Sequence, residues 1–258
     1  MKKYIKDLKV AAVEYPHELY VLLKLTDSEP LPHVHPGQFV EVKVEGSPST
    51  FLRRPISINY VDRENNQLWL LVKKAGDGTR QLATLKPGDC LNLVFPLGNG
   101  FSPVQKQGEK VLLSGGGVGV APLLEYGKYL KENGAQPVFL LGARSASDLL
   151  ELDMFRAVAP VYITTEDGSV GERGFVTQHS VLAQQTFDRI SVCGPKPMMV
   201  SLARYAKQTS TPCEVSLENM MACGLGACLC CVEKTVKGNV CVCKEGPVFN
   251  INDLTWNI

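Results

Sequence analysis

The sequence predicts a six-stranded antiparallel β barrel over residues 1–104, a parallel-sheet α/β domain over 105–217 and a small C-terminal lobe over 218–258. Short β-like runs fill the first part, and strands alternate with helices in the second. Six of the nine cysteines fall between residues 221 and 246. Because the lobe is too short for a core of its own, we expect a metal to hold it together.

The predicted barrel strands are short runs separated by turn residues. In the run 38–44, apolar residues largely alternate with polar ones, as in a half-buried strand. Similar runs are found at residues 8–15, 18–25, 55–61, 67–74 and 90–95. Turn signals such as Pro36-Gly37 and Pro87-Gly88 lie between them. Six short strands in about a hundred residues indicate a small antiparallel barrel.

The α/β pattern begins near residue 105. An apolar strand at 110–117 leads into a predicted helix that ends at Gly134. Apolar strands and amphipathic helices then alternate through the runs 137–144, 148–158, 161–168, 175–185, 189–195, 197–208 and 213–219. This alternation indicates a parallel sheet with helices on both faces.

The overall charge is nearly balanced, with 27 Lys plus Arg against 26 Asp plus Glu. This balance gives no indication of nucleic acid or of an anionic membrane as a partner. The N-terminus lacks the apolar run of a signal peptide, and no stretch is long enough for a membrane span. We therefore expect a cytoplasmic protein, in which many cysteines favour metal or redox chemistry over disulfides.

Two motifs in the predicted barrel favour a ligand that carries a pyrophosphate. The motif Arg54-Pro55-Ile56-Ser57 offers a guanidinium and a hydroxyl at the start of a strand. Further on, the loop Gly76-Asp77-Gly78-Thr79 has backbone amides that can face a phosphate. Taken singly, the first also fits a surface arginine and the second an ordinary turn. Together, on neighbouring predicted strands, they favour a dinucleotide.

A glycine-rich turn follows the first predicted strand of the α/β domain. Gly115, Gly116, Gly117 and Gly119 lie between this strand and a helix whose first turn contains Pro122. Nucleotide phosphates bind at this place in α/β folds. The spacing differs from Gly-x-Gly-x-x-Gly, so a tight strand-to-helix turn is the alternative. We favour phosphate binding, because so many glycines reduce local stability.

Two further strand ends in this domain carry candidate site residues. Cys193 lies at the carboxyl end of a predicted parallel strand, where ligands bind in open sheets, although a small buried thiol is the alternative. Glu166 or Asp167 follows another strand and can accept hydrogen bonds from ribose hydroxyls or simply face solvent. An acid at this position repels a 2′-phosphate and so favours NAD over NADP.

The spacing Cys223-x4-Cys228-x2-Cys231 matches that of plant-type [2Fe-2S] proteins. Gly224 and Gly226 allow the loop to fold closely around a cluster. Zinc is the main alternative, because Cys228-x2-Cys231 is also a zinc half-site.

The spacing leaves the fourth ligand open. Cys241 and Cys243 lie two residues apart on a predicted strand, so both point to the same face. Alternation therefore does not choose between them. Cys230 falls outside the plant-type spacing, and we expect it to be a spare thiol.

Taken together, these motifs resemble the electron transfer subunit of class B dihydroorotate dehydrogenase, within the ferredoxin reductase superfamily. The resemblance covers nearly the whole chain and is most specific in "MACGLGACLCC" and "CKEGPVF". It implies FAD on the barrel, NAD on the α/β domain and a [2Fe-2S] cluster in the C-terminal lobe.

The resemblance also implies which residues bind these groups. It assigns FAD to Arg54, Pro55, Ile56, Ser57, Leu71, Val72, Lys73, Gly78 and Thr79. It selects Cys243 as the fourth ligand, because the family's ligand directly precedes a charged pair and Gly-Pro-Val-Phe. The implied ligand set is Cys223, Cys228, Cys231 and Cys243. Many superfamily members have an aromatic residue at the position of Ile56, so ring stacking on the flavin is lost there.

The implied function is electron transfer in pyrimidine (UMP) biosynthesis. We expect dihydroorotate to reduce FMN in a separate catalytic subunit, and electrons to cross the cluster singly to FAD. FAD then delivers hydride to NAD, with Cys193 near the nicotinamide. The expected assembly is a heterotetramer with two copies of each subunit.

The main alternative is the FAD/[2Fe-2S] NAD(P)H reductase subunit of a hydrogenase or of a ferredoxin-dependent transhydrogenase. A zinc-binding module without catalytic activity and a cluster-based redox sensor are further alternatives.

Overall fold

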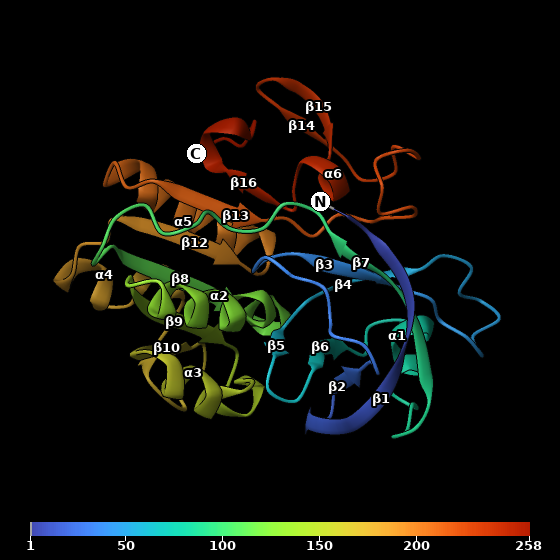
Figure 1. Ribbon diagram of the computed structural model, residues 1–258. Helices are drawn as coiled ribbons and strands as arrows, with labels where there is room; N and C mark the ends of the chain where they lie inside the picture. Colours follow the sequence, from blue (N-terminus) through green and yellow to red (C-terminus); the bar gives the residue numbers. More distant parts are fainter. Residues whose placement is uncertain (1) are drawn as a thin grey trace. The chain divides into compact units, whose positions relative to one another are not determined.

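The structure is a computed structural model that describes residues 2–258 (Figure 1). The chain forms two compact units. Unit 1 comprises residues 1–100, Glu218–Glu233 and Asn239–Pro247, and unit 2 comprises Phe101–Leu217, Lys234–Gly238 and Val248–Ile258. The predicted lobe 218–258 is thus distributed over both units.

Unit 1 is built on an antiparallel sheet of seven strands in the order β4-β3-β7-β1-β2-β6-β5. The strands are β1 (Tyr4–His17), β2 (Tyr20–Thr26), β3 (Phe39–Val42), β4 (Arg54–Ser57), β5 (Tyr60–Asp62), β6 (Gln67–Lys73) and β7 (Cys90–Leu97). A short helix, α1 (Asp77–Leu82), follows β6. Contacts between β4 and β6 show that the sheet curls into a barrel around fully buried residues such as Leu23, Val42 and Leu93.

The barrel has one strand more than predicted, because the run 55–61 forms two strands. The Ile58 N–H donates to the carbonyl oxygen of Gln38, which directly precedes β3. The next amide, that of Asn59, donates to Trp69 in β6. Two consecutive amides thus bond to different neighbouring strands, and the chain crosses from β3 to β6 at this point.

Unit 2 contains a seven-stranded sheet in the order β11-β10-β9-β8-β12-β13-β16. The strands are β8 (Lys110–Gly116), β9 (Gln136–Ala143), β10 (Val161–Thr165), β11 (Glu172–Arg173), β12 (Arg189–Cys193), β13 (Cys213–Ser216) and β16 (Val248–Asn250). All pairs are parallel except β13 with β16. The parallel α/β prediction is therefore confirmed.

Helices cover both faces of this sheet. The main ones are α2 (Ala121–Glu132), α3 (Leu152–Val158), α4 (Val181–Gln184) and α5 (Lys196–Gln208). Helix α2 packs against β8 and β9, and α5 packs against β12 and β13 on the other side (Figure 1). Because β9 and β13 lie on opposite sides of the pair β8–β12, the chain changes direction between these two central strands.

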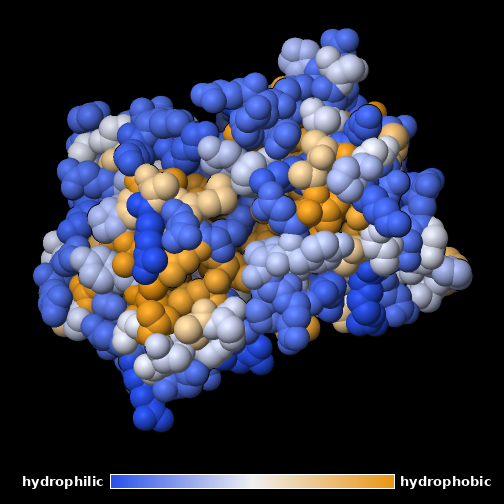
Figure 2. All heavy atoms as spheres, turned by 90° about the horizontal axis from the view of Figure 1, so that it is seen from below, coloured by the Kyte–Doolittle hydropathy of each residue, from blue (hydrophilic) through white to orange (hydrophobic). Residues whose placement is uncertain are grey.

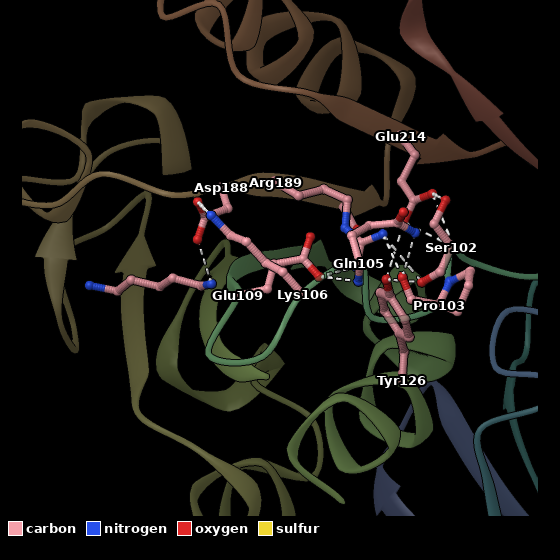
Figure 3. A network of polar contacts seen from close by, with 11 residues as sticks. Ser102, Pro103, Gln105, Lys106, Glu109, Tyr126, Asp188, Arg189 and Glu214 are labelled. Carbon is pink, nitrogen blue, oxygen red and sulfur yellow. Dashed lines mark hydrogen bonds and ion pairs between the residues drawn. The ribbon is translucent and has the colours of Figure 1, made fainter. Parts of the chain in front are cut away.

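Buried polar contacts fasten the segment that leads into β8 (Figure 3). The Glu214 carboxylate accepts hydrogen bonds from the hydroxyls of Ser102 and Ser191 at 2.8 and 2.7 Å. Arg189 lies 3.3 Å from the Glu109 carboxylate, and both side chains are buried. Because these charged groups have partners, the segment can lie against the sheet without leaving a buried charge alone.

The remaining elements belong to the C-terminal part. They are the hairpin strands β14 (Val232–Thr235) and β15 (Gly238–Cys241) and a one-turn helix, α6 (Val242–Glu245). None of the described helices has the length and apolar character that a membrane crossing demands. Figure 2 shows apolar patches bordered by hydrophilic residues on one face, a mixture that is usual for protein surfaces.

Candidate functional site

Two adjacent arginines at the start of β4 have different roles. Arg53 donates to the carbonyl oxygens of Glu41 and Asn92, both at 3.2 Å, and so ties β3 to β7. Arg54 makes a 3.3 Å hydrogen bond to the carbonyl of Arg53, and its Nε lies beside the backbone of Gly78. Arg54 therefore faces the start of α1, as expected if both motifs bind one ligand.

Gly78 is the position at which this arrangement requires glycine. A Cβ atom there would lie 2.9 Å from Thr50 Cγ2 and 3.2 Å from Arg54 Nε. The Thr79 hydroxyl accepts hydrogen bonds from the N–H groups of Ala75 and Gly76 at 2.9 and 3.0 Å. Thr79 thus shapes the loop, while Arg54 and the Gly78 backbone border the space beside it.

Four other residues that the resemblance assigns to FAD, Leu71, Val72, Lys73 and Ile56, lie in the barrel strands β6 and β4. Leu71 and Val72 are fully buried in β6, whereas Lys73 is exposed. Strand β5 pairs only with Gln67–Trp69, so within the described chain no strand pairs with that edge of Leu70–Lys73. A flavin would meet Leu71 and Val72 through their backbone. Ile56 packs against the barrel core.

In unit 2, the glycine-rich turn and Cys193 lie side by side. Gly115 and Cys193 are register partners on the adjoining strands β8 and β12. A Cβ atom on Gly119 would lie 2.5 Å from the Cys193 carbonyl oxygen and 2.5 Å from Gly194 Cα. The turn therefore packs directly on the segment after β12. This is where the chain changes direction between strands, the place at which open α/β sheets bind ligands.

The carboxyl end of β10 presents two exposed acids, Glu166 and Asp167. Asp167 accepts hydrogen bonds from the hydroxyl and N–H of Ser169 at 2.6 and 2.9 Å. These bonds hold the pKa of the Asp167 carboxyl below its usual range. The end of this strand therefore carries negative charge at neutral pH.

Among the cysteines, Cys223 lies within a loop of backbone donors. The N–H of Leu225 donates to Cys223 Sγ at 3.3 Å. Burial opposes ionisation of this thiol, but hydrogen bonds from N–H groups in the loop 225–228 outweigh it and lower the pKa of Cys223 to about 6. Such bonds favour the thiolate, which is the form that binds a metal.

Cys231 and Cys243 are both buried and lie together. The Cys243 N–H donates to Cys231 Sγ at 3.4 Å, and the Gly226 N–H donates to Cys243 Sγ at 3.1 Å. Burial and the neighbouring Cys231 raise the pKa of Cys243 to about 12. Two thiols held so close in a buried place suit a bound cation, which deprotonates the thiols that coordinate it.

The backbone N–H and C=O groups of Gly226 distinguish Cys243 from Cys241. The N–H donates to Cys243 Sγ, whereas the carbonyl oxygen accepts from the Cys241 thiol at 3.8 Å. Cys241 also contacts Cys231. A carbonyl oxygen repels a thiolate, so this geometry favours Cys243 as the fourth ligand and Cys241 as a neutral thiol. Cys230 is exposed.

The candidate ligands lie in contact two by two. Cys223 contacts Cys228, and Cys231 contacts both Cys243 and Cys241. Within residues 2–258, no group of three or more His, Cys, Asp or Glu side chains is arranged to hold a metal ion. A [2Fe-2S] cluster takes four cysteines, two at each iron, and the pairs fit this requirement.

One residue beside this site escaped the sequence analysis. Glu41 stands in the alternating run 38–44, where a polar residue is expected to face solvent. It is instead fully buried, and neither carboxylate oxygen has a hydrogen-bond partner among the described residues. A Cβ atom on Gly224 would lie 2.6 Å from Glu41 Cγ, so the cysteine loop covers this carboxyl. Burial raises the pKa of Glu41 to about 7, although Arg53 lowers it.

Comparison with known proteins supports an iron–sulfur site at these cysteines. Residues 218–255 match the family model described as the iron–sulfur cluster binding domain of dihydroorotate dehydrogenase B. The chain is 42% identical over 228 residues to the NAD(+)-linked electron transfer subunit from Shouchella clausii, covering 85% of this chain and 86% of the relative. The chain belongs to the family of dihydroorotate dehydrogenase B electron transfer subunits. A second family member, from Lysinibacillus sphaericus, is 41% identical over 220 residues, covering 83% and 84% of the two chains.

Solved structures confirm the ferredoxin-reductase-like fold. A chain of NADH-dependent reduced ferredoxin–NADP oxidoreductase matches with a TM-score of 0.86 and 28% identity, covering 97% of this chain and 90% of the other. Phthalate dioxygenase reductase, at 18% identity and a TM-score of 0.66, shares the fold over 93% and 94% of the chains. The family and fold support FAD, [2Fe-2S] and NAD as cofactors, and the alternative complexes are not favoured.

Proposed function

We propose that this chain is the subunit that passes electrons from an FMN-containing dihydroorotate dehydrogenase catalytic subunit to NAD, in the pyrimidine biosynthesis of the cytoplasm. Family membership supports the reaction. The observation that carries the proposal is that Cys223, Cys228, Cys231 and Cys243 all lie in the segment that matches the iron–sulfur domain of this family, with the Cys243 N–H bonded to Cys231 Sγ.

When bound, the flavin exchanges a hydride with nicotinamide and single electrons with the iron–sulfur cluster. The chain's own residues prepare the binding places. The two cysteine pairs hold the cluster, with the Gly226 N–H oriented toward Cys243. Arg54 provides the guanidinium for the FAD pyrophosphate, and Gly119 lets the glycine turn reach Cys193. Cys193 then positions the nicotinamide.

The cysteine loop also carries the surface that we assign to the catalytic subunit. Met220, Leu225 and Leu229 are 85%, 46% and 64% exposed within a few residues of the candidate ligands. Apolar side chains this exposed in one segment mark a protein interaction site. Covering them with a partner would bring the cluster next to the partner's cofactor and keep water from it. We expect two copies of each subunit in the assembly.

Co-expression with an FMN-containing dihydroorotate dehydrogenase subunit tests the proposal. The complex should reduce NAD with dihydroorotate as the electron donor. Leu229→Asp should weaken the complex, because a charge replaces an apolar contact, whereas Ile5→Asp is the control at a side chain that is 71% exposed on β1. If no complex forms and NAD reduction by dihydroorotate stays absent, the proposal is wrong. Activity with hydrogenase or ferredoxin partners instead would favour the alternative.

A further inference from the structure

The residue after β9 conflicts with the expected preference for NAD. In nucleotide-binding α/β folds, an acid on the strand after the glycine turn binds the ribose 2′-hydroxyl, whereas an arginine nearby accepts the 2′-phosphate of NADP. Here β9 follows the glycine turn and α2, and Arg144 comes directly after its last residue. By position alone, Arg144 would therefore favour NADP, whereas Glu166 and Asp167 favour NAD.

The structure shows that this arginine already has a carboxylate partner. Arg144 Nη2 lies 3.0 Å from Asp148 Oδ1, and the two side chains are 71% and 16% exposed. The one-turn helix Ala146–Asp148 folds back to bring the acid into reach. The other oxygen of Asp148 accepts from the Ser145 hydroxyl at 3.0 Å. The carboxylate is thus held in place, and the exposed guanidinium lies against it.

The loop after β10 adds negative charge to the same place. The Asp167 N–H donates to the Arg144 carbonyl oxygen at 3.2 Å, so this loop lies against the one after β9. The Ala146 N–H donates to the Ser169 hydroxyl at 2.8 Å and closes the contact. On the other side of the loop, the stem of Arg173 packs against Gly168. These two adjoining loops therefore carry the acids Asp148, Glu166 and Asp167 together with Arg144, and Arg173 lies beside Gly168.

We infer that the Arg144–Asp148 ion pair sets the choice between NAD and NADP. Asp148 occupies the guanidinium that would otherwise bind a 2′-phosphate, so a phosphate must displace one carboxylate beside a loop that carries two more acids. A ribose with a free 2′-hydroxyl meets no such repulsion and can donate to a carboxylate. This inference rests on the proposed NAD-linked function and names the residues that determine its specificity.

The test is to remove the charge of Asp148 in the full-length chain with its flavin bound. Flavin reduction is followed with NADH and with NADPH as donors, and 2′,5′-ADP is compared with ADP as an inhibitor. In Asp148→Asn, the ratio of kcat/KM for NADPH to that for NADH should rise about tenfold, through KM. Inhibition by 2′,5′-ADP should strengthen relative to ADP. Adding Arg144→Ala should abolish both changes.

A matched control lies in the same unit. Asp153 on α3 is exposed and pairs with Arg156 at 3.8 Å, so Asp153→Asn makes the same charge change outside the strand ends and should leave the ratio unchanged. If Asp148→Asn folds poorly, Glu166→Gln is the second test variant, and it should also raise the ratio of kcat/KM for NADPH to that for NADH. Bound flavin and iron report folding in every variant.

Several results would overturn the inference. These are an unchanged ratio in Asp148→Asn and in Glu166→Gln, a gain that survives Arg144→Ala, or a wild type that uses NADPH as well as NADH. If the gain in NADPH use is lost when Arg173→Ala, rather than Arg144→Ala, is added, then Arg173 is the residue that binds the 2′-phosphate. If neither nucleotide reduces the bound flavin of the wild type, the proposed NAD-linked function fails, and the inference falls with it.

Discussion

Replacing Gly78 with alanine tests the flavin site at its closest contact. The new Cβ atom would lie 2.9 Å from Thr50 Cγ2 and 3.2 Å from Arg54 Nε, against an ordinary contact of 3.4–4 Å. Thr50 must therefore move by about half an ångström, and Arg54 must shift by a few tenths of an ångström from its place beside the loop. Gly76→Ala is the matched control, since nothing lies within 4 Å of its Cβ position.

The size of the effect follows from the role of Arg54. A hydrogen bond between a guanidinium and a phosphate contributes about 1.5–3 kcal/mol. At about 1.4 kcal/mol for each factor of ten, its loss weakens FAD binding by roughly 10- to 100-fold. The free energy of unfolding should change less, because alanine stabilises a helix over glycine by up to about 1 kcal/mol and offsets part of the clash.

The assay is the titration of flavin-free protein with FAD, followed by fluorescence. Gly78→Ala should show the weaker binding, and Gly76→Ala should stay within about twofold of the wild type, because its backbone is already extended. Unchanged FAD affinity in Gly78→Ala would refute the reasoning. An equal loss in both variants would show that the whole loop, rather than the approach to Arg54, was disturbed.

Three further predictions concern the cluster, the buried network and the nucleotide site. Cys243→Ser should lose the cluster iron and its visible absorption but keep FAD, while Cys241→Ser keeps all three; iron that follows Cys241 would show that the ligand assignment is wrong. Glu109→Gln leaves the buried guanidinium of Arg189 without its counter-charge, so the free energy of unfolding should fall by about 3–5 kcal/mol in a urea titration, and an unshifted midpoint would contradict this. Gly119→Ala should raise the KM for NADH severalfold and leave FAD bound, because its Cβ would lie 2.5 Å from backbone atoms; wild-type kinetics would remove the glycine turn from the nucleotide site.

The barrel shows which structural features the local sequence pattern does not predict. Alternation identified the strands, but it joined β4 and β5, because the break at Ile58 and Asn59 depends on hydrogen bonds to two different strands. It also expected Glu41 at the surface. That carboxyl is buried because the cysteine loop, far along the chain, covers it. Both differences arise from contacts between distant segments, which periodicity does not record.

The sequence by itself predicted the two fold classes and, through cysteine spacing, Cys223, Cys228 and Cys231 as candidate ligands, whereas FAD and NAD were implied by the family resemblance of its motifs. Strand length, helix period and cysteine spacing are local properties, so a single chain displays them. The resemblance alone had selected Cys243 over Cys241, and only the tertiary structure added a geometric argument for that choice and revealed the ion pair between Arg144 and Asp148. Each depends on the direction of one hydrogen bond or ion pair between neighbouring groups, and that direction exists only after the chain has folded.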